Sequence, residues 1–396
     1  MSTNRDCPIC GSGEHKLLFS QHFTGISSGS LLDGYDVVAC QNCGFCFASS
    51  IPEQSMFNQY YRDLSKYEHQ GLMNELSEYD ISRYSKSAQL LSEFVEDKQA
   101  RILDVGCSTG GLLNALKQVG YKNLHGLEPS PLCARLARQR YDVEVFTGSL
   151  SDLPAPPSSY DLIILGSVIE HIRDLKSALT QLRVLLSPNG LVYIDAPDAT
   201  RFGETTEAPF QEFSTEHINY FSPITLINLM EEIGFVKIHL LQTSVEPNPG
   251  KVVCEIKGLF VKRKKAGVFS PEQDHETEKA MTKYISDSVL VEEQIHQVIN
   301  QIASDGTPIL IWGVGSHTQR LLATSQLSHA NIQVFIDSNP RYQGKTLLGK
   351  PIISPNDVRN YDNPILIASR GYQKEIDNII KKVLELPNKV IYLYHI

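Results

Sequence analysis

The chain is 396 residues long, 41% apolar and 20% charged, and its formal net charge is −9, so it is long enough for two or three hydrophobic cores. Such an acidic chain is not suited to nucleic acid as its main partner, because phosphate binding needs a basic surface. No apolar segment has the length of a membrane span and the first residues lack a signal-peptide pattern, so we expect a cytoplasmic protein without a membrane partner.

Two Cys-x-x-Cys pairs stand near the start of the chain, CPIC at 7–10 and CQNC at 40–43. Each pair can form a tight turn that directs two thiolates toward one point, and two such turns complete a tetrahedral zinc site. Free buried cysteines are the alternative, but the pattern occurs twice. Four thiolates leave no open position, so the zinc would be structural and contribute ~10–16 kcal/mol of apparent binding free energy. The predicted ligands are Cys7, Cys10, Cys40 and Cys43.

Two further interpretations of these cysteines are open at the level of sequence. Cys46 could pair with Cys43, and we leave Cys46 out of the ligand set. A redox role is less favoured, because neither pair opens a helix in a βαβ unit.

Residues 100–120 predict a buried strand, a glycine-rich turn and a helix. The turn has the pattern G-x-S-x-G-G and contains Gly106, Ser108 and Gly110, whose small side chains let the backbone approach a ligand. A second strand ends at Glu128, where a carboxylate can bind both hydroxyls of an adenosine ribose. By itself this pattern also fits NAD.

The continuation of the sequence resembles the class I methyltransferases. LDVGCSTGGLL is similar to motif I of that family, in which the residue matching Asp104 commonly faces the methionine end of S-adenosylmethionine. VEVFTGSLSDLP is similar to the third strand and the turn that holds the adenine, where Ser149 and Leu150 are the matching positions. A fourth strand, a fifth strand and a closing antiparallel hairpin follow. The resemblance implies a doubly wound sheet of seven strands with its site at the strand C-terminal ends.

His171 lies just past the fourth predicted strand, in the tail EHI, where the transferred methyl group would point. Chemistry alone leaves Glu170 and His171 equally well explained as ordinary residues in the first turn of a helix. The family resemblance favours a place for His171 in the site.

The connection over residues 196–222 is long and has no clear periodicity, and long ordered loops inside compact domains are usually functional. It ends in STEHINYFS, directly before a helix that Ser222 caps. Glu216, His217 and Tyr220 are therefore expected over the methyl donor, beside the fifth strand. Alternatively, His217 caps the helix and Tyr220 packs against the core. We favour function for Glu216 and His217, and Tyr220 joins them as a candidate.

The combination of a four-cysteine module, a class I core with EHxxYFS and a Rossmann-like C-terminal part resembles the sugar C-methyltransferases that act on nucleotide-linked keto-deoxysugars. The resemblance implies that His217 is the base that removes the proton next to the keto group. It also implies that Glu216 orients this base and that His171 lies near the keto oxygen. The enolate formed in this way would attack the donor methyl group in line.

The sequence departs from that family at two places where substrate would bind. Ser214 stands where relatives often have a tyrosine, and the tyrosine-rich segment 56–71 contains a single serine. The alternative is therefore an O-methyltransferase acting on a sugar or glycan. A non-catalytic zinc-containing binding protein is less favoured, because the glycine turn and Glu128 are intact.

The C-terminal part repeats the order of strand, Gly-x-Gly turn and helix, with Gly313 and Gly315 in the turn. A second strand ends at Asp337, so one interpretation is a second nucleotide pocket with NAD as its ligand. The third glycine of the dinucleotide fingerprint is missing, because His317 and Thr318 follow the turn. We favour a nucleotide-binding fold that packs on the core and helps to hold the nucleotide of the substrate.

Together these features predict an α/β chain in three parts. They are a zinc module with a linker (1–75), a methyltransferase core with a Rossmann-like doubly wound sheet (76–266) and a second Rossmann-like domain (267–396). We expect a monomer that uses S-adenosylmethionine and a structural zinc ion, and that acts on a small molecule.

Overall fold

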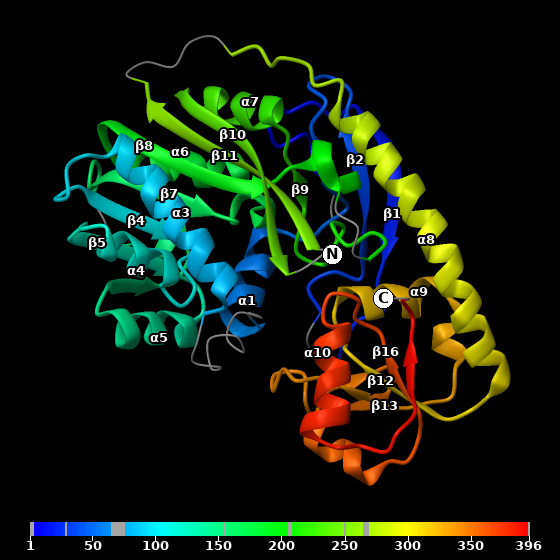
Figure 1. The fold of residues 1–396 in the computed structure, drawn as a ribbon. Helices are drawn as coiled ribbons and strands as arrows, with labels where there is room; N and C mark the ends of the chain where they lie inside the picture. The colour runs from blue at the N-terminus through cyan, green and yellow to red at the C-terminus, as the bar shows by residue number, and fades with distance from the viewer. Residues whose placement is uncertain are drawn as a thin grey trace.

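The described part of the chain forms three β-sheets in the computed structural model, and one long helix runs beside the small N-terminal sheet and the C-terminal sheet (Figure 1). The structure describes residues 4–27, 30–64, 76–153, 156–204, 208–248, 251–263 and 269–394. Within these ranges no helix has both the length and the hydropathy required to cross a membrane.

The central sheet has seven strands in the order β10-β11-β8-β7-β4-β5-β6. Its strands are β4 (Arg101–Val105), β5 (Asn123–Glu128), β6 (Glu144–Thr147), β7 (Tyr160–Gly166), β8 (Leu186–Pro197), β10 (Phe235–Asn248) and β11 (Lys251–Lys262). The five strands from β8 to β6 are parallel, and β11 pairs antiparallel with both β8 and β10. The predicted α/β sheet with its closing hairpin is confirmed.

Helices cover both faces of this sheet, which explains the run of four apolar residues, 162–165, in its central strand β7. The helices are α3 (Glu78–Phe94), α4 (Gly111–Gln118), α5 (Pro131–Tyr141), α6 (Leu175–Leu185) and α7 (Pro223–Ile233). Neighbouring residues of β4 pack on opposite faces. Ile102 joins the core cluster with α3, α4 and α5, and Leu103 joins the cluster with α6 and α7.

Helix α7 begins and ends as its sequence predicts. The Ser222 hydroxyl accepts a hydrogen bond from the Thr225 amide at 3.1 Å, and Pro223 occupies the first turn. Gly234 ends the helix with a φ of 92°, a left-handed conformation that favours glycine. These two ends fix the point at which the preceding STEHINYFS segment meets the central domain.

A smaller sheet combines the cysteine-containing N-terminus with a distant segment. It consists of β1 (His15–His22), β2 (Gly34–Cys40), β3 (Cys46–Ser49) and β9 (Asn219–Tyr220). Strand β9 belongs to the long connection of the central domain and pairs antiparallel with β3, with Cys46 opposite Tyr220 and Phe47 opposite Asn219. The sequence does not indicate this strand, because two residues are too few to show a period.

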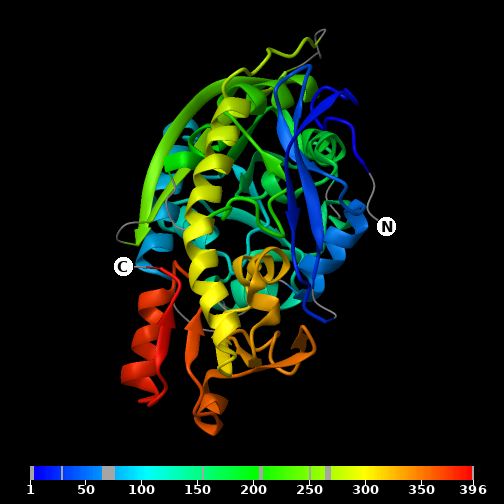
Figure 2. The same cartoon turned by 90° about the vertical axis from the view of Figure 1, so that its right-hand side faces the viewer.

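Helix α1 (Gln54–Leu64) follows the small sheet, and η3 (Ala199–Glu204) and η2 (Ile169–His171) are short 3₁₀ segments of the central domain. The long helix α8 (Thr277–Asp305) then runs the length of the molecule, as Figure 2 shows. Met281 and Tyr284 pack in one core cluster with the small sheet, whereas Ile295 and Ile299 pack against the C-terminal sheet. The helix therefore joins these two parts of the molecule.

The C-terminal sheet has six strands in the order β14-β15-β13-β12-β16-β17. Its elements are β12 (Ile309–Trp312), α9 (Ser316–Thr324), β13 (Ile332–Ile336), β14 (Thr346–Leu347), β15 (Lys350–Ile353), β16 (Ile365–Ile367), α10 (Gln373–Asn378) and β17 (Val390–Tyr392). Strands β15, β13, β12, β16 and β17 are parallel, and the edge strand β14 is antiparallel.

Candidate active site

A cavity of about 1590 Å³ lies between the C-terminal ends of the central strands and the C-terminal sheet. On the central side its lining includes Gly106, Glu128 and His171, and on the C-terminal side it includes Gly313 and Asp337. The cavity is therefore large enough for two ligands that meet near the middle.

The glycine turn after β4 lies against the acidic end of β5. Gly106 has a φ of 73°, and a Cβ atom there would be 2.8 Å from Val168 Cγ2, so the close approach requires glycine. Glu128 accepts hydrogen bonds from the Ser108 amide at 2.9 Å and from the Ser130 amide at 2.8 Å. The carboxylate is thus held in place by the two turns that flank it.

Most of the predicted donor-binding residues meet at this end of the cavity. Those that line it are Gly106, Ser108, Glu128, Ser149 and Leu150. Asp104 and Gly110 are not among the described residues that line the cavity, although their chain neighbours Val105 and Thr109 are. Burial, reinforced by the charges of Asp195 and Glu128, raises the pKa of Asp104 to about 8.

The two Glu-His pairs of the sequence, 170–171 and 216–217, lie side by side. The His171 ring is 3.0 Å from the Glu216 carbonyl oxygen through Nδ1, and because a carbonyl accepts, Nδ1 carries the hydrogen. The Ile218 amide donates to the Glu170 carbonyl at 2.9 Å. The rings of His171 and His217 are 5.0 Å apart between centroids, at 67°. The structure thus places His171 against both Glu216 and His217.

These residues differ in how they face the cavity. His171 and Ser214 line the cavity. Glu216, His217 and Tyr220 are not among the described residues that line it. Glu216 is 5% exposed and accepts a hydrogen bond from the Tyr60 hydroxyl at 3.2 Å. His217 is half-buried behind His171.

Tyr220 is fully buried and contacts the backbone of the segment. Its hydroxyl donates to the His217 carbonyl at 3.1 Å and lies 3.2 Å from the Tyr35 hydroxyl. Burial, followed by the neighbouring Tyr35, holds the pKa of Tyr220 well above its usual value. This position suits a residue that holds His217 in place.

Ser214 has a local role that explains a small side chain at this position. Its hydroxyl accepts hydrogen bonds from the Glu216 amide at 3.3 Å and the His217 amide at 3.1 Å. The Tyr35 hydroxyl donates to the Ser214 carbonyl at 2.8 Å. The serine therefore forms the turn that presents the Glu-His pair.

Comparison with known proteins identifies the activity. Residues 77–240 match the family model described as a methyltransferase domain, and residues 306–392 match one described as C2185-like, N-terminal. The C-methyltransferase NovU of Streptomyces niveus is 23% identical over 96% of this chain and 93% of its own length. The protein is a methyltransferase that uses S-adenosylmethionine.

Two further comparisons each cover less than half of this methyltransferase. A probable S-adenosylmethionine-dependent methyltransferase of Mycolicibacterium smegmatis is 27% identical over 34% of this chain and 51% of its own length. The solved structure of an S-adenosylmethionine-dependent methyltransferase from Methanosarcina mazei is 16% identical, with a TM-score of 0.38, over 44% of this chain and 98% of its own.

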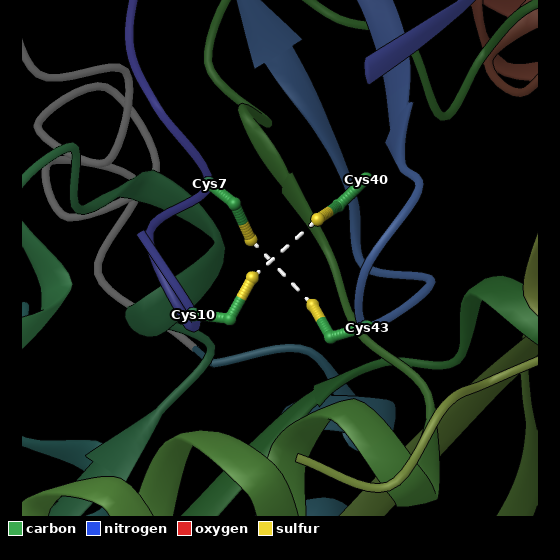
Figure 3. A group of neighbouring side chains, drawn as sticks. All are labelled: Cys7, Cys10, Cys40 and Cys43. Atoms are coloured by element: carbon green, nitrogen blue, oxygen red, sulfur yellow. Dashed lines mark hydrogen bonds between the residues drawn. The ribbon is translucent and has the colours of Figure 1, made fainter. Parts of the chain in front are cut away.

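The four predicted zinc ligands of the methyltransferase form one cluster (Figure 3). Their sulfur atoms lie within 4.8 Å of one another, with Cys7 at 3.6 Å from Cys43 and Cys10 at 3.5 Å from Cys40. Zinc bound to four thiolates at ~2.3 Å would separate the sulfurs by ~3.8 Å, so the cluster fits a tetrahedral ion. Cys46 is not part of this cluster of described residues; its sulfur is 3.8 Å from the Gly44 carbonyl oxygen.

The sequence did not indicate the side of the cavity that helix α3 provides. Arg83 and Tyr84 line the cavity, and the Arg83 guanidinium donates to the Ser167 hydroxyl at 3.2 Å. That hydroxyl donates to Asp195 at 3.0 Å. Arg83 stands in an ordinary amphipathic helix, so no local motif reveals it. The close approach of Tyr84 to Gly111, where a Cβ atom would be 2.5 Å from the ring, is a contact between distant segments.

Proposed function

We propose that this methyltransferase transfers the donor methyl group to a carbon atom of a nucleotide-linked keto-deoxysugar. The meeting of the two Glu-His pairs beside the donor end of the cavity carries this proposal. The similarity to a C-methyltransferase along nearly the whole chain supports carbon as the acceptor.

In this proposal the glycine turn holds S-adenosylmethionine. The amides of the turn and the α4 N-terminus face the methionine part, and Glu128 binds the ribose hydroxyls. Ser149 and Leu150 hold the adenine, and Asp104 stands at the methionine end. Arg83 is placed to bind the donor carboxylate, because it is a cation on the same wall of the cavity.

His217 is the proposed base. It takes the proton from the carbon next to the keto group, and the resulting enolate carbon attacks the methyl group of the sulfonium. The bond between sulfur and methyl breaks, and sulfur keeps the electron pair, which leaves neutral S-adenosylhomocysteine. A well-placed base of this kind typically contributes ~10²–10⁴-fold to the rate.

His171 is proposed to bind the keto oxygen as an imidazolium. Its Nδ1 hydrogen is already donated to a backbone carbonyl, so only a protonated Nε2 can donate to substrate. Glu170 Oε1 is 3.8 Å from Nε2, so this carboxylate would face the imidazolium. The imidazolium would stabilise the negative charge of the enolate oxygen.

The C-terminal end of the cavity is proposed to hold the nucleotide of the substrate. Asp337 accepts hydrogen bonds from the Val314 amide at 3.0 Å and the Asn339 amide at 2.8 Å. Glu128 accepts a corresponding pair of hydrogen bonds at the donor end. One comes from an amide of the glycine turn, and the other comes from the amide two residues after Glu128 itself. Arg370 lines the cavity nearby and offers a cation for the diphosphate.

A screen of nucleotide-sugars with S-adenosylmethionine tests the function directly. We expect a keto-deoxysugar nucleotide to gain the mass of one methyl group, with the new methyl carbon bonded to carbon in the NMR spectrum. A methyl group on oxygen would instead establish the O-methyltransferase. The absence of methylation across keto and hydroxy sugars would reject both.

Donor binding should strengthen as the pH rises from 6.5 to 8.5. With a pKa of about 8, Asp104 is largely protonated at neutral pH, and the positive charges of the donor favour its carboxylate. Binding below pH 8 therefore releases a proton, and the Kd should fall by up to about ten-fold per pH unit before it levels off. Calorimetric titration at several pH values measures this slope.

The matched control for this pH dependence is Asp104→Asn, which removes the titrating group and should flatten the slope. S-adenosylhomocysteine, which lacks the sulfonium charge, should show a smaller slope than the donor. A donor Kd that stays constant across this pH range would contradict the proposed place of Asp104.

A further inference from the structure

Arg5 is a buried cation that joins three segments of the chain. Its guanidinium donates to the Ala48 carbonyl at 2.9 Å, the Arg173 carbonyl at 2.9 Å and the Ile218 carbonyl at 2.7 Å. It also donates to Asn219 Oδ1 at 2.9 Å and lies over the Phe47 ring at 5.2 Å. The side chain is 7% exposed.

These contacts are specific to a planar guanidinium. The four acceptors belong to β3, to the segment after His171 and to the segment after His217. All four are carbonyl oxygens of the backbone or of a side-chain amide, and a lysine has only three donors on one nitrogen atom. Arg5 stands two residues before Cys7, so the cysteine module supplies the side chain that fixes both histidine segments.

Asn219 continues this connection on the other side. While its Oδ1 accepts from Arg5, its Nδ2 donates to the Ile169 carbonyl at 2.8 Å and the Ile172 carbonyl at 2.7 Å. Its amide thus holds the residues on both sides of Glu170 and His171. The side chain is 2% exposed, so water does not replace these bonds.

We propose that Arg5 and Asn219 are positioning residues that tie the cysteine module to the histidine pair, so that the module sets the placement of His171 against His217. The expected effect on kcat rests on the proposed function, whereas the connection between the cysteine module and the two histidine segments does not. A shift of about 1 Å in a catalytic group can cost about 10²-fold in rate, so loss of this connection should lower kcat without weakening donor binding.

The variants Arg5→Lys and Asn219→Asp test the connection. Asn219→Asp keeps an acceptor for Arg5 but removes both donors to the segment around His171, and it is nearly the same size. In the wild type, ¹⁵N-histidine NMR should show a slowly exchanging ring N–H from His171, assigned by its absence in His171→Gln. We expect this signal to disappear or shift in both variants. Both variants should still bind one zinc per chain, and their donor Kd should stay within about two-fold of the wild-type value.

The control is Ser20→Ala, which removes an exposed bond from Ser20 to Asp36 on the same small sheet and should leave the signal in place. An unchanged His171 signal in the two variants would overturn the proposal. Loss of the signal together with zinc, donor binding or folding would also overturn it, because the residues would then serve stability alone. The NMR result needs no acceptor, so it stands even if the screen of sugars fails.

Where the screen identifies an acceptor, kinetics add a second measurement. We expect kcat to fall about 10²-fold in Asn219→Asp while the KM for the donor changes little. A variant with the wild-type kcat would overturn the positioning role.

Discussion

Replacing His217 by alanine should lower the rate of methyl transfer about 10²–10⁴-fold, because the variant lacks the proposed base. The donor site should be unaffected, since its residues lie on the turns after β4, β5 and β6. The measurements are kcat with the identified acceptor and the donor Kd. In heavy water with S-adenosylhomocysteine, the exchange of deuterium next to the carbonyl should fall in parallel with kcat.

The exchange experiment also separates the two histidines. His171→Gln should reduce exchange by removing the cation at the keto oxygen, and added imidazole should restore exchange in His217→Ala but not in His171→Gln. His275→Ala, a change at an exposed histidine, should behave as wild type. Full exchange in His217→Ala together with none in His171→Gln would make His171 the base. That outcome is physically reasonable, because a neutral His171 has a lone pair at Nε2.

The donor half of the site could be predicted from the sequence because its signals are local. A strand, a turn with small residues and a helix occupy consecutive positions, and Glu128 ends the next strand. The two caps of α7 are local as well. Ser222 at the start and Gly234 at the end each bond to residues within one turn of their own end of the helix. The placement of these elements follows from bonds between residues that are close in the chain.

The acceptor half depends on contacts between distant segments, which local patterns do not show. The hydrogen-bond partners of Arg5 are separated from it along the chain by 43, 168, 213 and 214 positions. The same is true of β9, whose two residues become a strand because β3 offers an edge. The sequence therefore identified Glu216 and His217 as candidates but did not show that the cysteine module holds them.

The predicted roles of Tyr220 and Ser214 illustrate this difference. Tyr220 is a catalytic candidate because it is a titratable residue beside a Glu-His pair, and the structure adds that it is buried and bonded to the backbone of His217. Ser214 departs from the family pattern, and its hydroxyl forms the turn by accepting from the Glu216 and His217 amides. The predicted domain boundary at 266 and the part of segment 56–71 beyond residue 64, including Ser65 and Tyr67, lie outside the described residues.

Replacing Cys40 by serine should remove the zinc ion and abolish methyl transfer, with donor binding largely retained. A four-thiolate zinc site supplies ~10–16 kcal/mol of apparent binding free energy, which is as large as the whole net stability of a typical domain at ~5–15 kcal/mol. The small sheet should therefore lose its order without zinc. Metal analysis, circular dichroism, calorimetric titration with the donor and an assay of methyl transfer measure the four effects separately.

The matched control is Cys46→Ser, which changes a buried cysteine of the same sheet that lies outside the cluster. It should keep one zinc per chain and most of the activity. Loss of zinc in Cys46→Ser, or full zinc and activity in Cys40→Ser, would contradict the assigned ligand set. Activity is the decisive measurement, because β9, which pairs with β3, begins two residues after His217. None of the four clustered cysteines is among the described residues that line the cavity. Their loss should nevertheless reduce activity, because the proposed base loses its support if the small sheet loses its order.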